Sequence, residues 1–236
     1  MAKNLHFARA FTMIELLVIM AIIAVLVSIA YPVYTGIIER GKATKDLSNL
    51  RQIGIAAQAY MNDSDGTLFL TSSSWMLQLE SNQKYLSAWG VLESPFDRRS
   101  PSEIGANATP NLASPISYGI NPNSVGIAVS IISKPTIFVL FAPAGAAGPD
   151  VSFLGRATDV PGGTVLGNGN GTATTKPNNQ TVTGGTQNTR TRINALFADL
   201  HSETMPWSTF TNSASTANDP DGQYRWNPSP TPAPPP

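Results

Sequence analysis

The chain contains no cysteine, and charged side chains are scarce in it. The lack of cysteine excludes disulfide bonds and thiolate metal sites. Asp, Glu, Lys and Arg make up 13% of the residues, about half the usual share. Lys and Arg number 15, and Asp and Glu also number 15, so the formal net charge is zero. Without a basic excess the protein lacks the broad positive surface of nucleic-acid-binding proteins, and we predict no nucleic-acid partner.

Residues suited to catalysis are also few. The chain has two histidines. His6 lies in the first ten residues, which leaves His201 as the one candidate general base in the rest of the chain. Ser, His and Asp do not stand in the order of a known catalytic triad, and there is no Cys nucleophile. We therefore predict that the protein is not an enzyme.

The most distinctive feature present is a long apolar run with one carboxylate at its edge. Residues 16–38 contain no charged side chain over 23 positions, enough for a helix to span a bilayer. Glu15 stands directly before this run. A charged side chain there costs about 3 kcal/mol if it must enter lipid, so selection for an apolar anchor alone would not retain it. We therefore treat Glu15 as a functional residue.

Two interpretations of Glu15 stay open from the residues themselves. The first ten residues are basic and contain no acid. Cleavage after Ala10 would create an α-ammonium at Phe11, and Glu15 is the only acid close enough in sequence to neutralise it. Alternatively, Thr12 and Glu15 have the Ser/Thr-x-x-Glu spacing of a capping box, in which Glu15 closes the start of a helix.

The segment from Ala10 to Val18 reads Ala-Phe-Thr-Met-Ile-Glu-Leu-Leu-Val. It resembles the class III signal of type IV prepilins and type II secretion pseudopilins. The resemblance implies that a prepilin peptidase cuts between Ala10 and Phe11 and methylates the new amine of Phe11. It also implies that Glu15 forms the assembly salt bridge with a neighbouring subunit. Ala10 departs from the family, which nearly always has Gly at this position.

The resemblance further implies an α+β, pilin-like fold, in which a long N-terminal helix packs on an antiparallel sheet. The expected parts are a leader peptide at residues 1–10 and a transmembrane and filament-core helix at 11–38. A periplasmic or extracellular globular domain is expected at 39–226, followed by a disordered proline-rich tail at 227–236. The expected function is that of a structural subunit in a type IV pilus-like or type II secretion pseudopilus filament.

Location and partners follow from the same resemblance. Lys3 and Arg9 precede the apolar run and favour a cytoplasmic N-terminus, whereas Arg40, Lys42 and Lys45 follow it and favour the opposite orientation. The resemblance to prepilins decides for the cytoplasmic N-terminus, because that signal is read with its N-terminus inside. We expect a single-pass inner-membrane protein with a periplasmic C-terminal domain, which enters a periplasmic or extracellular filament after assembly. The implied partners are the prepilin peptidase, identical or homologous subunits, an inner-membrane assembly platform and membrane lipid.

The expected helix runs from Thr12 to about Asn62. Pro32 should kink it, because proline removes one backbone hydrogen bond. The second half has an apolar face, with charged and amide residues predicted on its other faces. The predicted apolar set is Leu47, Leu50, Ile53, Ala57 and Tyr60, and the predicted outer set is Lys45, Asp46, Arg51 and Gln52. Residues 62–66 should end the helix by turn chemistry.

Short strands are predicted beyond this helix. A short helix or paired turns are expected within residues 75–90, and a mobile Gly/Asn-rich loop at 162–187. Strands are expected near 117–120, at 125–132, 136–142 and 192–199, with a further strand at 202–207 that forms a hairpin with 192–199. Residues 150–159 are expected to extend the sheet.

Two of these segments resemble a pseudopilin-like group found in Planctomycetes and Verrucomicrobia-type bacteria. They are residues 117–121, Ser-Tyr-Gly-Ile-Asn, and residues 194–203, Asn-Ala-Leu-Phe-Ala-Asp-Leu-His-Ser-Glu. Leu200 stands where that group usually has Gly.

Two groups of acidic residues and a histidine are considered as possible metal ligands. Asp199, His201 and Glu203 alternate, so on one strand they would share a face, either as metal ligands or as a solvated edge. We expect no cofactor. Calcium is the one ion that the pseudopilin resemblance raises, near Asp219 and Asp221.

One other function is consistent with the N-terminus. Ser28, Ile29 and Ala30 fit the small-x-Ala pattern of a signal-peptidase site. Cleavage after Ala30 would give a secreted or membrane-anchored extracytoplasmic protein that begins at Tyr31 and lacks Glu15.

Overall fold

The computed structural model describes residues 11–70, 75–80, 84–86, 88–97, 117–143, 185–188 and 191–230. The chain divides into two compact units, residues 1–41 and residues 42–236. Helix α1 runs through both, and each unit is described by itself. The sequence-based predictions for residues 150–159, for most of 162–187 and for 231–236 concern parts of the chain outside the described residues.

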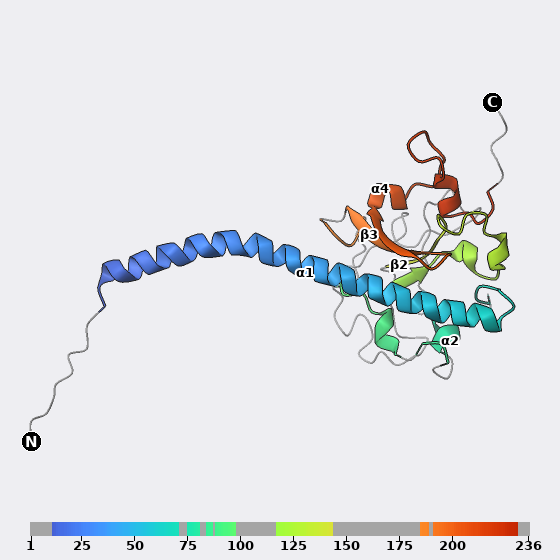
Figure 1. The fold of residues 1–236 in the computed structure, drawn as a ribbon, viewed down its shortest axis with the longest axis horizontal. Coiled ribbons are helices and arrows are strands. Elements are labelled where there is room, and N and C mark those ends of the chain that lie inside the picture. Colours follow the sequence, from blue (N-terminus) through green and yellow to red (C-terminus); the bar gives the residue numbers. More distant parts are fainter. Residues whose placement is uncertain are drawn as a thin grey trace, which may run out of the picture. The chain divides into compact units, whose positions relative to one another are not determined.

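Helix α1 spans Met13–Asp63, a run of 51 residues, as the sequence predicts (Figure 1). It ends by turn chemistry, also as predicted. The Gly66 N–H donates to the Met61 carbonyl over 2.9 Å. Asp65 and Gly66 both have positive φ angles, 50° and 75°, in the left-handed region that closes helix C-termini.

Pro32 lies inside α1, and the helix continues through it. Proline has no N–H, so the Ser28 carbonyl lacks its helical hydrogen-bond donor at this turn. A Cβ added to Gly36 or to Gly41 would meet nothing within 4 Å. Packing inside the chain therefore does not explain these glycines, and each weakens the helix by about 1 kcal/mol relative to Ala. A kink at Pro32 remains a prediction.

The second unit is built around a four-stranded antiparallel sheet of order β1-β2-β3-β4. The strands are β1 Tyr118–Ile120, β2 Val139–Pro143, β3 Arg192–Phe197 and β4 Ser202–Pro206. Tyr118 pairs with Pro143, Phe141 with Leu196, and Ala195 with Glu203. The long helix and this sheet give the predicted α+β, pilin-like arrangement. The strand near 117–120 and the hairpin of β3 and β4 are confirmed.

The predicted strand at 125–132 is wrong. This segment contains a 3-10 turn, η4 Val129–Ile131, and its contact with residues 66–69 includes an isolated bridge between Thr67 and Ala128 but no strand of the sheet. Gly126 has a φ of 77°, a left-handed conformation that turns the chain. The Val and Ile residues of the segment give no sign of this turn. Its N–H donates to the Leu68 carbonyl over 2.7 Å. The β-branched residues of this segment therefore line a turn.

The ends of two strands also differ from prediction. β2 begins at Val139, because the Phe138 N–H donates to the Lys134 carbonyl in a turn. β3 ends at Phe197, because the next residues form the turn of the β3–β4 hairpin. The shorter elements are α2 Trp75–Glu80, η2 Trp89–Leu92, η3 Pro122–Ser124, α4 Trp207–Phe210 and η6 Gly222–Arg225.

The second half of α1 packs on the sheet through one face. A Cβ on Gly54 would lie 3.1 Å from the Leu196 Cδ2 atom, which shows how closely helix and strand approach. Burying a Leu or Ile side chain here contributes about 1.5–3 kcal/mol. The buried helix residues are Asp46, Asn49, Leu50, Ile53, Gly54, Ala56, Ala57, Tyr60 and Met61. Asp46 was predicted on an outer face, so this prediction is wrong.

Candidate functional site

The start of α1 carries the residues that the sequence singles out. The Glu15 Oε2 atom accepts hydrogen bonds from the Thr12 N–H over 2.9 Å and from the Thr12 hydroxyl over 2.7 Å. The Glu15 N–H donates to the Thr12 Oγ1 atom over 3.3 Å. This is a complete capping box, so the capping interpretation describes the isolated chain. Among the described residues, no hydrogen bond to the Glu15 Oε1 atom is seen, which leaves that side of the carboxylate for another donor.

The helix that follows is exposed along its apolar length. Within the described part of the chain, α1 is the one helix long and apolar enough to cross a membrane. None of its most apolar 18-residue window is buried, and the mean hydropathy of that window is 2.9. Phe11, at the predicted cleavage point, is 69% exposed. An apolar surface of this extent needs lipid or another protein to cover it.

A known protein family matches the N-terminal segment of the chain. Residues 6–31 match the family model described as the prokaryotic N-terminal methylation motif. This motif is the type IV pilin and pseudopilin signal. No curated protein and no solved structure has a significant match to the chain. The signal and the apolar helix together fit a single-pass membrane anchor.

The matched residues include the predicted cleavage point, the predicted methylation site and Glu15. The resemblance of residues 117–121 and 194–203 to the Planctomycetes-type group lies outside the match and stays a prediction. One departure from that group has a structural consequence. Leu200, in the place of the usual Gly, has a φ of 70° in the β3–β4 turn, a conformation that glycine adopts without strain.

The structure separates the candidate metal ligands. Asp199 and His201 lie in the β3–β4 turn and contact each other through Oδ1 and Nδ1, while Glu203 lies on β4. His201 also stacks on the Phe197 ring with centroids 4.3 Å apart. Among the described residues, no three of His, Cys, Asp or Glu lie together in a way that would hold a metal ion.

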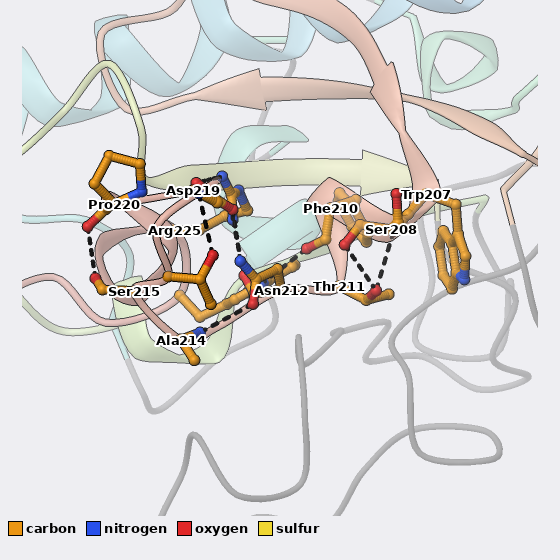
Figure 2. Close-up of polar contacts among 12 residues, drawn as sticks. Trp207, Ser208, Phe210, Thr211, Asn212, Ala214, Ser215, Asp219, Pro220 and Arg225 are labelled. Atoms are coloured by element: carbon orange, nitrogen blue, oxygen red, sulfur yellow. Dashed lines mark hydrogen bonds and ion pairs between the residues drawn. The ribbon is translucent and has the colours of Figure 1, made fainter.

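The two aspartates near the C-terminus have protein cations as partners. Asp219 accepts hydrogen bonds from Arg225 over 2.9 Å and 3.2 Å and from the Asn212 amide over 2.6 Å. Figure 2 shows these three side chains pointing toward one another. Burial opposes ionisation of Asp219, but the bonds from Arg225 and Asn212 outweigh it, and its pKa is lowered. Asp221 pairs with Lys134. A calcium ion here would have to displace these partners.

A buried polar cluster, which the sequence analysis missed, centres on Asp46. The Asp46 Oδ1 atom accepts hydrogen bonds from the Ser94 and Tyr118 hydroxyls, each over 2.6 Å. The Oδ2 atom accepts from the Asn194 amide over 2.8 Å. The Asn49 amide also donates to the Tyr118 hydroxyl over 3.3 Å. This cluster joins α1 to β1, to β3 and to the segment after η2.

The electrostatics of this cluster are unusual. Asp46 has no exposed surface, and no ion pair to it is seen among the described residues. Desolvation raises the pKa of its carboxyl, and the hydrogen bonds from Ser94, Tyr118 and Asn194 partly oppose this rise. The sequence signal was present, because Asp46 stands at helical spacing from Asn49, Leu50 and Ile53. The carboxylate itself suggested solvent exposure instead.

Proposed function

We propose that the protein is a structural subunit of a type IV pilus-like or type II secretion pseudopilus filament. The observation that carries this proposal is the methylation motif at residues 6–31, which overlaps the exposed apolar half of α1. An apolar helix of this length, preceded by a carboxylate at Glu15, has the features needed first in a bilayer and then in the core of a filament.

Processing comes first in the proposed mechanism. Prepilin peptidase cleaves between Ala10 and Phe11 and methylates the Phe11 amine. The mature chain then begins one residue before Thr12, whose N–H and hydroxyl bind Glu15. Ala10 is small, so we expect it to be accepted in place of the usual Gly.

Assembly follows extraction of the subunit from the inner membrane through an assembly platform. The Phe11 ammonium of one subunit pairs with Glu15 of its neighbour. Thr12 binds one carboxylate oxygen of Glu15, and the ammonium binds the other. In apolar surroundings a mispaired ammonium or carboxylate would remain as an uncompensated charge, which costs several kcal/mol. The pair therefore sets the axial register between subunits.

The proposed topology places the N-terminus in the cytoplasm and the second unit in the periplasm before assembly. Lys3 and Arg9 before the apolar run support this orientation, whereas Arg40, Lys42 and Lys45 after it favour the opposite one. The proposal follows the methylation motif, whose family is read with its N-terminus in the cytoplasm. The residues proposed for processing and assembly are Ala10, Phe11 and Glu15, with Pro32 as the proposed helix kink.

Mass spectrometry of the protein from its native membrane, or from sheared surface material, tests the processing step. The expected mature chain begins at Phe11 and carries one methyl group on its amine. A chain that begins at Tyr31 would instead show signal-peptidase cleavage, which removes Glu15 and contradicts the filament proposal. An uncleaved Met1 terminus would also contradict it, unless Ala10→Gly restores cleavage.

A charge variant tests the assembly step. Glu15→Gln preserves size and one acceptor oxygen but cannot neutralise an ammonium. We expect cleavage before Phe11 to continue, while filaments in the sheared fraction fall at least about tenfold. Ser28→Ala, a polar change inside the same apolar helix, serves as the matched control and should assemble normally. Normal filament yield from Glu15→Gln would refute the pairing.

A further inference from the structure

Two tyrosines lie near the C-terminal end of the apolar run of α1. Tyr31 is 67% exposed and Tyr34 is 62% exposed. They stand three positions apart on the helix, so their rings lie on the same face. Within the described part of the chain, neither phenol hydroxyl has a hydrogen-bond partner. Neither cleavage before Phe11 nor the pairing of Glu15 uses these two side chains.

The apolar run is longer than a bilayer requires. With a rise of about 1.5 Å per residue, α1 covers about 35 Å from Glu15 to Ile38, whereas the hydrocarbon core of a bilayer is about 30 Å thick. From Glu15 to Tyr34 the helix covers about 29 Å, which matches this core. Because the Glu15 carboxylate is costly to place in lipid, it marks one boundary of the core. Tyr34 then reaches the other boundary, and Ile38 lies beyond it.

The chemistry of tyrosine suits this depth. Its ring is apolar, but its hydroxyl needs a hydrogen-bond partner, so tyrosine is enriched where a membrane meets water. At the boundary, the hydroxyls can donate to phosphate and ester oxygens of phospholipid headgroups. Tyr31 lies about 4.5 Å deeper than Tyr34 along the helix, a distance that its long side chain can bridge.

Pro32, between the two tyrosines, favours the same boundary. It leaves the Ser28 carbonyl without its helical donor. In hydrocarbon, a backbone acceptor without a partner costs several kcal/mol. The missing bond lies within about one turn of Tyr34, so headgroup water can satisfy the carbonyl if the apolar core ends near Tyr34. If the core extended to Ile38, the same carbonyl would lie deeper.

We propose that Tyr31 and Tyr34 anchor α1 where the helix leaves the hydrocarbon core, by donating hydrogen bonds to phosphate and ester oxygens of phospholipid headgroups. The inference rests on the membrane-anchor part of the proposed function and does not depend on filament assembly. The tyrosine pair places the membrane boundary at Tyr34. Residues 35–38, although uncharged, then lie in the headgroup layer.

Spin labelling of the full chain tests this proposal. Because the chain has no cysteine, one introduced cysteine carries the only label. Val27→Cys and Ile38→Cys are made separately, labelled, and reconstituted at low density in vesicles of dioleoylphosphatidylcholine. Collision rates with oxygen and with a water-soluble nickel chelate give the depth of each label. We expect the backbone at residue 27 about 10 Å inside the level of Tyr34, and that at residue 38 about 6 Å outside it.

Three variants, each combined with the label at residue 38, test the tyrosines themselves. Y31L/Y34L removes both rings and should move the label at least about 3 Å toward the bilayer centre, because the whole apolar run exceeds the core by about 5 Å. Y31W/Y34W keeps an apolar ring with a polar N–H group and should leave the depth unchanged. Val33→Leu, an apolar change between the tyrosines, is the matched control and should also leave it unchanged.

The outcomes separate this inference from the proposed function. An equal depth of the residue-38 label with and without the tyrosines would overturn the inference and assign the two rings to protein contacts. The same inward movement in Val33→Leu would overturn it too. If the nickel chelate reaches residue 27 as readily as residue 38, α1 does not span the bilayer, and the membrane anchor fails together with the inference. The mass of the labelled protein shows whether the chain begins at Phe11, so processing is judged separately.

Discussion

Replacing the buried carboxylate of Asp46 should destabilise the second unit strongly. Asp46→Ala leaves the Ser94 and Tyr118 hydroxyls and the Asn194 amide without their acceptor. A hydrogen bond to a charged group contributes about 1.5–3 kcal/mol, so the three together contribute about 4.5–9 kcal/mol before desolvation. Desolvation of the carboxylate offsets part of this sum. We expect a net loss of about 3–5 kcal/mol in the free energy of unfolding.

Asp46→Asn is the informative companion, because it keeps the volume and removes the charge. Its amide oxygen can accept from Asn194, and its NH₂ group can face the Ser94 and Tyr118 hydroxyls, which are able to accept as well as donate. We therefore expect a loss of about 1 kcal/mol at pH 7. The exposed residue Glu203 supplies the control, since Glu203→Ala should change stability by less than about 0.5 kcal/mol.

The pH dependence follows from the raised pKa of Asp46. A carboxyl whose pKa is higher in the folded state than its unfolded value of 3.8 favours folding most when it is protonated. This contribution is complete below pH 3.8 and is lost as the pH rises through the folded pKa. The difference between the wild type and Asp46→Asn should therefore be larger at pH 4 than at pH 7.

Denaturant unfolding of the full chain in detergent, followed by tryptophan fluorescence, measures these differences. Trp75 and Trp226 are buried in the second unit and report its unfolding. Circular dichroism would be less informative, because the apolar half of α1 stays helical in detergent. A loss below about 1 kcal/mol for Asp46→Ala would refute the reasoning. So would a penalty for Asp46→Asn that grows with pH.

Three further changes test other parts of the second unit. Leu200→Gly should raise the free energy of unfolding by about 1 kcal/mol by relieving the positive φ, whereas Leu200→Ala should not; equal effects in denaturant melts would contradict this. Chelation of divalent metal should leave the melting temperature unchanged, because Arg225 neutralises Asp219; a drop of several degrees in differential scanning fluorimetry would point to a metal instead. Gly54→Leu should lower the free energy of unfolding by about 1–3 kcal/mol, because the new side chain crowds the buried Leu196. An unchanged free energy of unfolding would show that the helix and the sheet adjust to the larger side chain without cost.

Some of the candidate site could be predicted because its signals are local. The Thr12–Glu15 spacing predicts the capping box that the structure contains. The methylation motif is likewise a contiguous string, and residues 6–31 match it as a unit. The β3–β4 hairpin was also predictable, because the apolar run that forms β3 is followed, after a short turn, by a second segment able to pair with it. Each of these features depends on residues a few positions apart.

Other features depended on contacts between distant residues. The sequence at 125–132 favours a strand by its Val and Ile content, but Gly126 turns the chain so that Leu68 and Thr67 become its neighbours. The metal hypothesis for Asp219 required knowledge of Arg225, whose side chain points back into the same loop (Figure 2). Neither arrangement leaves a periodic signal in the sequence.

The amino-acid sequence by itself determined the signal, the apolar anchor and the full length of α1, because helix periodicity and capping are properties of consecutive residues. Only the tertiary structure decided that Asp46 is buried. A carboxylate on a helix favours solvent unless donors from elsewhere replace water, and here the donors are 48, 72 and 148 residues away in the chain. These donors come together only because α1 packs on the sheet. A pattern of neighbouring residues therefore could not predict the burial of Asp46.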